Sequence, residues 1–479
     1  MTDSTRPTTD RTVSRPTRRT FLKAAGASVA AGTVGGLALG TAGAVGIATP
    51  WLHRDGNWMK DPSGNEVTLR GVNVPDAKRM DSKDFRPDHD ETIGRATDPE
   101  RGWYSRVIRL PLQPLDIGGH NTGGIPPMPG FTQDQLDTYL ETYVDPAVEY
   151  CAERNVYCIV DYHRHREQGE EYLYTSEETD AELTMFWETV APRYAEDSHV
   201  IYEVYNEPIG PFPGEGDPTT NVAVTEDRAK EEGWDVWKEA AQPWVDTIRE
   251  NAPQNPIIIG SPRWSQYTYW AKDEANEFDG DNLGYVGHVY AHENLRPLGE
   301  YFGPPAENVP VFMTEFGWAQ DGSPYLVGSA EEEGQDFVDF FEEYPQVSWT
   351  VWCFDSKWSP AMMNHDWSLN EFGEFWRAEL ETYRGVNEPD GDVPTDETTP
   401  GTTTETPTPP AIDGTVPQDV DGDGLYEDFN ANDKLDFPDV NTLFQHTDSP
   451  SVQENAALFD IDGDGGVDLQ DVLALFETV

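Results

Sequence analysis

Eight short apolar runs, most of them separated by longer amphipathic stretches, constrain the fold of this 479-residue chain most strongly. They occupy residues 67–74, 106–112, 156–162, 200–205, 256–260, 285–290, 311–314 and 347–354. Near-continuous apolar strands with helices between them indicate a parallel sheet that is buried on both faces. An open, doubly wound sheet is the alternative, but no glycine-rich phosphate loop follows the first run. We therefore predict an α/β fold in which residues 51–383 form a (β/α)8 barrel.

Two glutamates stand at the ends of these runs. Glu207 follows the fourth run within Asn206-Glu207-Pro208, and Glu315 follows directly on the seventh. In a (β/α)8 barrel the carboxyl ends of the strands meet at one face and supply the catalytic groups, so we expect these two carboxylates to face each other. A facing pair of carboxylates is the arrangement that hydrolyses glycosidic bonds.

Motifs at seven of the eight strand ends resemble glycoside hydrolase family 5, the large cellulase and mannanase family. The resemblance covers roughly residues 65–380. Each motif is short, so their common order and spacing carry the resemblance. The matching motifs are Ile108-Arg109-Leu110, Asp161-Tyr162-His163, Asn206-Glu207-Pro208, Trp264-Ser265-Gln266, His288-Val289-Tyr290, Thr314-Glu315-Phe316-Gly317 and Trp349-Thr350-Val351-Trp352.

The resemblance implies a retaining β-glycanase that needs no catalytic cofactor, with Glu315 as the nucleophile and Glu207 as the acid/base. We expect the cation of Arg109 to lower the pKa of the nucleophile, and Tyr290 to orient it. Roles in substrate binding are implied for Arg109, His163, Asn206, Trp264, His288, Tyr290, Trp352 and Lys357.

Some of these assignments have alternatives. His163 and His288 are equally compatible with core histidines, and Trp264 and Trp352 with core packing instead of sugar stacking. Lys357 falls where cellulase relatives carry a substrate-contacting lysine, but its surroundings depart from the family pattern. The first expectation for the substrate is β-1,4-glucan, with β-mannan as the alternative. A non-catalytic polysaccharide-binding protein is the other class, although binding alone requires no paired carboxylates.

The charge of the chain is extreme. It has 89 acidic against 32 basic residues and a formal net charge of −57. With 15 Trp, 20 Tyr and 20 Phe there is ample material for a core, so we place the acidity on the surface of a folded, salt-adapted protein. A nucleic-acid partner is excluded because phosphate binding needs basic patches.

Residues 1–44 resemble a twin-arginine export signal, with Arg18-Arg19 before an Ala/Gly-rich run. Cleavage near Ala42-Gly43-Ala44 predicts a secreted protein with no membrane association afterwards. An uncleaved anchor is the alternative, because the run is long enough to span a bilayer.

A Pro/Thr-rich linker is expected over residues 384–418, and a small all-α module over 419–479. The module repeats a calcium-loop pattern with a spacing of 32 residues and resembles a dockerin, which implies bound Ca²⁺ and a possible cohesin-like protein partner. The predicted ligands are Asp428, Asn430, Asn432, Asp436 and Asp439 in the first loop, and Asp460, Asp462, Asp464, Asp468 and Asp471 in the second.

Overall fold

The computed structural model describes residues 49–389, apart from 83–84, 121–124, 165–169, 212–222, 292–294 and 324. It also describes residues 409–478, apart from 413–414, 419–424, 433, 436, 448, 454, 456–457, 460, 462–466 and 468. The predicted export signal and most of the predicted linker lie outside the described residues. So do five predicted calcium ligands, namely Asp436, Asp460, Asp462, Asp464 and Asp468. The chain divides into two compact units, Met1–Thr395 and Asp396–Val479.

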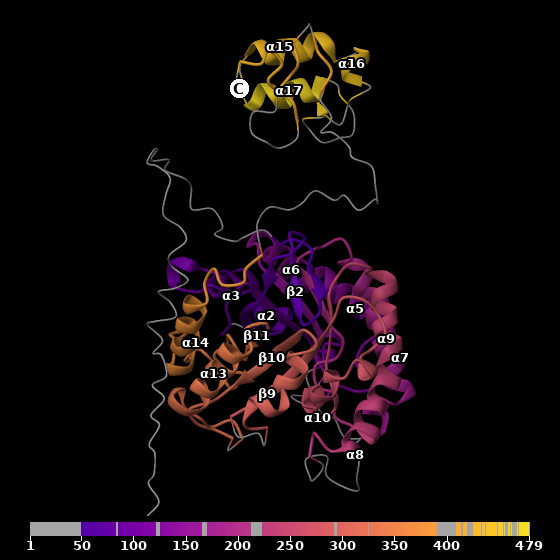
Figure 1. Ribbon diagram of the computed structural model, residues 1–479, viewed down its shortest axis with the longest axis vertical. Coiled ribbons are helices and arrows are strands. Elements are labelled where there is room, and N and C mark those ends of the chain that lie inside the picture. Colours follow the sequence, from indigo (N-terminus) through magenta and orange to yellow (C-terminus); the bar gives the residue numbers. More distant parts are fainter. Residues whose placement is uncertain are drawn as a thin grey trace, which may run out of the picture. The chain divides into compact units, whose positions relative to one another are not determined.

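The first unit contains a closed barrel of eight parallel strands, as predicted, and the alternative of an open sheet is wrong (Figure 1). In order around the barrel, the strands are β4 (Arg70–Asn73), β5 (Val107–Leu112), β6 (Tyr157–Tyr162), β7 (Val200–Glu203), β8 (Ile257–Ile259), β9 (Leu283–Tyr290), β10 (Val311–Gly317) and β11 (Ser348–Val351). Strand β11 pairs with β4 and closes the ring. Nearly all strand residues are buried, because the strands are covered on both faces.

Helices surround the strands, and the long helices α7 and α9 lie side by side (Figure 1). The helices of this unit are α2 (Ala77–Ser82), α3 (His89–Ala96), α4 (Pro114–Ile117), α5 (Gln133–Tyr139), α6 (Asp145–Glu153), α7 (Glu177–Arg193), α8 (Asp227–Ala229), α9 (Asp235–Asn251), α10 (Pro262–Ser265), α11 (Leu298–Tyr301), α12 (Gly303–Ala306), α13 (Gln335–Glu343) and α14 (Glu371–Thr382). Their apolar faces meet the outside of the barrel in one large core. Among the described residues, no helix has both the length and the apolar character needed to cross a membrane.

A small antiparallel sheet closes the amino-terminal end of the barrel. It consists of β1 (His53–Asp55), β2 (Trp58–Lys60) and β3 (Glu66–Val67). Apolar side chains from this region, including Met59 and Val67, join a second core with residues near the starts of the barrel strands. This end is therefore filled by packing, and the opposite end is left for function.

The segment that follows α14 returns to the first barrel strand. The backbone N–H of Thr68 donates to the carbonyl of Asn387 at 2.8 Å, and the Arg70 guanidinium donates to the carbonyl of Val386 at 2.7 Å. The guanidinium of Arg70 also lies 4.6 Å from the centre of the Tyr383 ring. Residues 386–387 are thus fastened beside the seam where the last strand meets the first.

The second unit contains helices α15 (Phe437–His446), α16 (Pro450–Gln453) and α17 (Leu469–Thr478). Its core is small and includes Phe429, Leu443, Phe459 and Leu475. Three of the predicted calcium ligands, Asp428, Asp439 and Asp471, are fully buried here. Their carboxylates accept hydrogen bonds from backbone N–H groups of the loops: Asp439 from Asn430, Asp428 from Asn432 and Asp471 from Ile461.

Candidate active site

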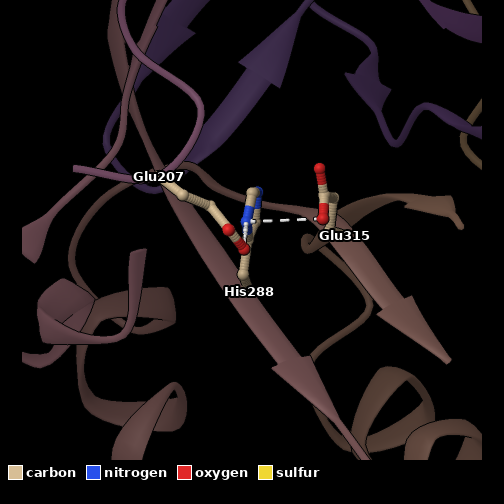
Figure 2. A group of neighbouring side chains, drawn as sticks. All are labelled: Glu207, His288 and Glu315. Atoms are coloured by element: carbon tan, nitrogen blue, oxygen red, sulfur yellow. Dashed lines mark hydrogen bonds and ion pairs between the residues drawn. The ribbon is translucent and has the colours of Figure 1, made fainter. Parts of the chain in front are cut away.

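Glu315 reaches the carboxyl end of the barrel through an irregularity in β10. The pairing of β10 with β9 shifts register between Phe312 and Glu315. Neighbouring side chains of a regular strand point to opposite faces, whereas a bulge re-aims one of them. As a result both Thr314 and Glu315 turn toward His288, the residue of β9 that lies between the two glutamates (Figure 2).

Glu207 and Glu315 meet across His288. One ligand atom each of Glu207, His288 and Glu315 lie within 4.8 Å of one another. The structure thus brings together the two carboxylates that the sequence placed at different strand ends (Figure 2).

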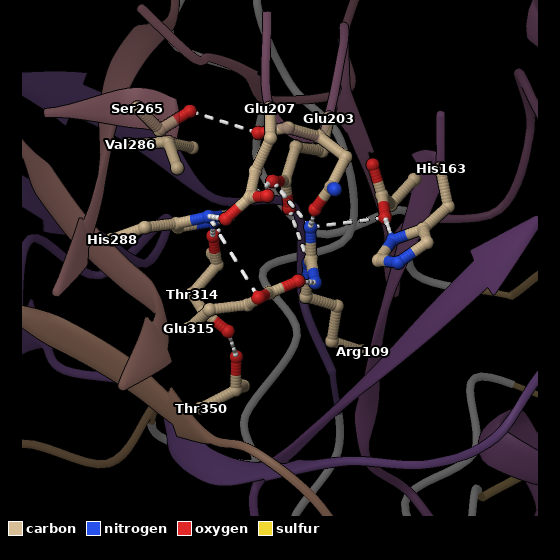
Figure 3. A network of polar contacts seen from close by, with 12 residues as sticks. Arg109, His163, Glu203, Glu207, Ser265, Val286, His288, Thr314, Glu315 and Thr350 are labelled. Atoms are coloured by element: carbon tan, nitrogen blue, oxygen red, sulfur yellow. Dashed lines mark hydrogen bonds and ion pairs between the residues drawn. The ribbon is translucent and has the colours of Figure 1, made fainter. Parts of the chain in front are cut away.

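The guanidinium of Arg109 holds together a buried polar cluster, which we call the floor of the site (Figure 3). The floor consists of Arg109, Asp161, Glu203, Asn206 and Glu315. Arg109 of β5 donates to Glu315 at 2.7 Å and holds both oxygens of Glu203 at 2.7 Å each. It also lies 2.9 Å from Asp161 and donates to the side-chain oxygen of Asn206 at 2.8 Å. The side chains of Arg109 and of its three carboxylate partners are at most 4% exposed. One cation therefore faces three buried carboxylates.

Burial of these three carboxylates sets the protonation of the floor. Burial raises the pKa of Glu315 to about 7, against the opposing effects of His288 and Arg109. Burial likewise raises the pKa of Asp161 to about 7, and it raises the pKa of Glu203. Arg109 lowers the pKa of Glu315, as expected, but desolvation outweighs this effect of a cation that three carboxylates share, so the net shift is upward.

A chain of hydrogen bonds connects Glu207 to the buried Glu203. His288 Nδ1 lies 3.1 Å from Glu207, and its Nε2 lies 2.8 Å from the hydroxyl of Thr314, which donates to Glu203 at 3.2 Å. Burial lowers the pKa of His288 to about 4, so the ring is neutral at pH 7. Because the one hydroxyl proton of Thr314 goes to Glu203, Nε2–H of His288 donates to Thr314. Nδ1 is then an acceptor, which favours a protonated Glu207.

Three other predicted residues take up places around this floor. The Tyr290 hydroxyl donates to the second oxygen of Glu315 at 2.9 Å, as expected. The side-chain Nδ2 of Asn206 is buried and has no hydrogen-bond partner among the described residues. His163 is buried and pairs with Asp161 at 2.6 Å.

The remaining predicted residues differ in their exposure. Trp352 stacks on His163 at 5.6 Å and on Trp358 at 5.4 Å between ring centres, and only 7% of it is exposed. Lys357 is exposed, and its amine lies 5.5 Å from the ring centre of Phe85, outside the polar network of the floor.

A left-handed turn carries Trp264. Within α10, Arg263 and Trp264 have φ values of 57°, with ψ of 56° and 46°, and Ser265 also has a φ of 57°. The backbone N–H of Trp264 donates to the carbonyl of Pro208 at 3.2 Å, and the Ser265 hydroxyl donates to the carbonyl of Asn206 at 2.8 Å. The turn is thus hydrogen-bonded to the residues on both sides of Glu207, and Figure 3 shows the bond from Ser265.

Glu207, His288 and Glu315 are also the one group in the described part of the chain whose spacing suits a metal ion. Both oxygens of Glu315 already accept hydrogen bonds, from Arg109 and from Tyr290. A cation at this position would compete with the adjacent guanidinium. The donor set therefore fits acid–base chemistry better than metal binding.

Sequence reasoning missed Glu203 and Thr314 as parts of the site. Both lie inside apolar runs, where a single polar residue carries little signal. A carboxylate such as Glu203 in a fully buried strand is nevertheless rarely tolerated without a partner, and that rule would have identified it.

Comparison with known proteins agrees with this geometry. The family model described as cellulase (glycosyl hydrolase family 5) matches residues 61–358. An endoglucanase of Halalkalibacter akibai is 29% identical over 279 residues, which are 53% of this chain and 30% of that protein. Endoglucanase C of Evansella cellulosilytica is 29% identical over 344 residues, 60% of this chain and 37% of that protein. The chain therefore matches only about a third of the length of these two curated relatives.

Among solved structures, the β-glucanase SdGluc5_26A of Saccharophagus degradans superposes with a TM-score of 0.55 at 24% sequence identity. The superposition covers 70% of this chain and 94% of that one. At this identity the likeness concerns the fold of the barrel.

Proposed function

Since the chain belongs to the cellulase family, glycosyl hydrolase family 5, we propose that this glycoside hydrolase cleaves β-1,4-linked glucan with retention of configuration at the anomeric carbon. The observation that carries the proposal is the approach of the two carboxylates, since an oxygen of Glu207 and one of Glu315 lie within 4.8 Å. Retaining enzymes hold their carboxyl groups about 5–5.5 Å apart, whereas inverting enzymes leave about 6.5–9.5 Å for a water molecule. The close approach of the two carboxylates supports the spacing of a retaining enzyme.

In the first step Glu315 attacks the anomeric carbon while Glu207 gives its proton to the departing glycosidic oxygen. Arg109 and Tyr290 each hold one oxygen of Glu315 and so fix the attacking carboxylate. In the second step Glu207, now ionised, takes a proton from a water molecule, whose oxygen attacks the anomeric carbon while the bond from that carbon to Glu315 breaks. The Nδ2 of Asn206, which has no hydrogen-bond partner among the described residues, is available to a sugar hydroxyl at this point.

The first prediction tests the two roles. We expect Glu207→Gln to lower turnover of polysaccharide by about 10²–10⁴-fold, and Glu315→Gln at least as much, because each removes a reacting group without changing its shape. Circular dichroism serves as the control for folding. Near-native turnover by either folded variant would contradict the assignment.

Azide separates the nucleophile from the acid/base. With Glu315→Ala and an activated aryl glycoside, azide attacks the substrate directly and gives the inverted sugar azide. With Glu207→Ala, azide intercepts the glycosyl-enzyme and gives the retained product. The opposite pairing of products would exchange the two roles.

The substrate rests on similarity to relatives named endoglucanase and β-glucanase. Initial rates on cellulose, mannan, xylan and mixed-linkage glucan, measured in concentrated salt, test it. We expect the highest kcat/KM on β-1,4-glucan. A preference for mannan would establish a β-mannanase, and binding without turnover on all four would establish a non-catalytic polysaccharide-binding protein.

The remaining parts of the proposal concern the setting of the enzyme. The surplus of acidic residues supports function in high salt, and the twin-arginine pattern within residues 1–44 supports secretion. In the second unit, the buried carboxylates of Asp428, Asp439 and Asp471 suit Ca²⁺, a hard cation that takes oxygen ligands. Bound Ca²⁺ supplies structural stability there, and a cohesin-like protein is the proposed partner of this unit.

A further inference from the structure

A cavity lies at the end of the barrel opposite the catalytic glutamates. Its walls include Trp103, Tyr104, Ser105 and Arg106, which directly precede β5, and Arg154, which lies between α6 and β6. Arg384 and Glu388, from the segment after α14, complete it. Its volume is about 240 Å³, enough for several water molecules or a small solute.

The cavity is positive in a protein that is otherwise very acidic. Three arginines and one carboxylate line it, although the chain as a whole has 89 acidic and 32 basic residues. The carboxylate, Glu388, lies 3.7 Å from Arg106 and also accepts the N–H of Gly385 at 2.7 Å. The charge of Arg106 is thereby compensated, so that Arg154 and Arg384 leave the cavity with an excess of two positive charges.

Neither Arg154 nor Arg384 forms an ion pair with a carboxylate in the described part of the chain. Arg154 donates to the hydroxyl and carbonyl oxygens of Thr97, at 3.0 and 2.9 Å. Arg384 lies 4.8 Å above the ring of Tyr104. Many of the other arginines do have such partners, for example Arg193 with Asp145 and Arg296 with Asp336.

A buried hydroxyl on the same wall points independently to a ligand. Ser105 is 3% exposed, and its Oγ has no hydrogen-bond partner among the described residues. A buried polar atom without a partner is unfavourable, so such atoms commonly mark the place of a bound group.

We propose that this cavity binds a small oxyanion, a carboxylate, sulfate or phosphate, between Arg154 and Arg384 with the Ser105 hydroxyl as a further donor. Guanidinium groups match the geometry of these anions and bind them through two parallel hydrogen bonds. Molar salt favours anion binding, because at a Debye length of about 3 Å the repulsion between the anion and the remote acidic surface is largely screened. The arginines in direct contact with the anion are screened less. The site is independent of the proposed glycosidase chemistry, because none of its residues touches the catalytic floor.

The test is calorimetric titration of the full chain with sodium acetate, sodium sulfate and sodium phosphate at constant ionic strength in sodium chloride. We expect saturable binding of one anion per chain for at least one of the three, and the strongest of them identifies the class. Arg384→Gln and Ser105→Ala should each weaken it by about tenfold or more. Arg228→Gln is the matched control, since this exposed arginine of α8 pairs with Glu232 and does not line the cavity, and it should leave the affinity unchanged.

Thermal unfolding of the same proteins excludes a trivial loss through misfolding. At one fixed concentration, the anion should raise the melting temperature of the wild type and of Arg228→Gln, and should raise that of Arg384→Gln less. Absence of saturable binding for all three anions, or equal affinity in Arg384→Gln and wild type, would overturn the proposal. Full glycosidase activity of Arg384→Gln is expected in either case, so the outcome is separate from that of the proposed function.

Discussion

Arg109 and Glu203 determine at the residue scale how the catalytic pair is charged. Glu203 is linked to Glu315 through the guanidinium of Arg109, and to Glu207 through Thr314 and His288. Glu203, a buried carboxylate that contacts neither reacting carboxylate directly, is thus coupled to both.

Since the pKa of Glu315 is raised to about 7, activity should rise with pH through about 7 as the nucleophile ionises.

Replacing Glu203 by Gln tests this coupling. The neutral amide leaves two carboxylates instead of three on Arg109, so Glu315 should ionise more readily and the acidic limb of the kcat profile should move to lower pH. We also expect kcat to fall by about 10–100-fold, because Arg109 and Thr314 lose the acceptor that positions them.

Glu182→Gln is the matched control for this change. Glu182 is also a buried carboxylate paired with a buried arginine, Arg164, but it lies outside the catalytic floor. It should lower stability without moving the acidic limb. An unmoved limb in Glu203→Gln, or an equal movement in Glu182→Gln, would contradict the assignment.

At the scale of elements, the sequence predicted the strands well and their irregularities not at all. Apolar runs mark the eight strands because burial on both faces demands them. The register shift before Glu315 and the left-handed turn at Arg263–Ser265 arise from tertiary contacts, which a hydrophobic pattern does not encode. Glu207 and Glu315 were predicted because they stand at strand ends. The net rise of the pKa of Glu315 was not predicted, since it depends on how deeply the carboxyl group is buried.

The left-handed turn stores strain close to Glu207. A left-handed conformation costs a residue other than glycine roughly 1–2 kcal/mol, and strained backbone of this kind often occurs where it positions functional groups. We expect Arg263→Gly to leave the free energy of unfolding unchanged or to raise it by up to about 1 kcal/mol, because glycine adopts this conformation without the steric cost.

Urea unfolding of Arg263→Gly and of Glu239→Gly measures the difference. Glu239 is exposed within the right-handed helix α9, where glycine should cost about 1 kcal/mol. Equal destabilisation by both substitutions would show that the turn is not strained.

On the scale of the whole molecule, net charge and domain construction govern stability. A formal charge of −57 opposes the compact state through self-repulsion. Many basic residues in the described part of the chain already form ion pairs with carboxylates, for example Arg193 with Asp145, so mobile cations must supply the remaining compensation. The second unit has a small core in addition to this charge, which makes a bound cation more important there.

We therefore expect the melting temperature to rise from low salt to molar KCl or NaCl, because screening relieves the repulsion. Differential scanning calorimetry over this range measures it, with sucrose of equal osmolality as the control for exclusion of cosolvent. A flat or falling melting temperature would count against salt adaptation.

Calcium should bind to the second unit of the full chain. We expect titration calorimetry to show saturable binding, and Asp471→Asn to weaken it on the order of tenfold, since a charged oxygen ligand is lost. Asp246→Asn is the control, because Asp246 is an exposed carboxylate on α9. Identical calcium binding by all three proteins would refute a site at Asp471.

The fastening of residues 386–387 to Thr68 and Arg70 has a practical consequence for anyone who dissects this chain. The last helix ends at Thr382, and a truncation placed directly behind it looks natural. Such a truncation removes residues 386–387, which hold the junction between the first and last strands. It also removes Arg384 and Glu388, which form one wall of the oxyanion cavity. A protein made of the barrel alone should therefore end beyond Glu388, so that residues 386–387 remain and keep their hydrogen bonds to Thr68 and Arg70.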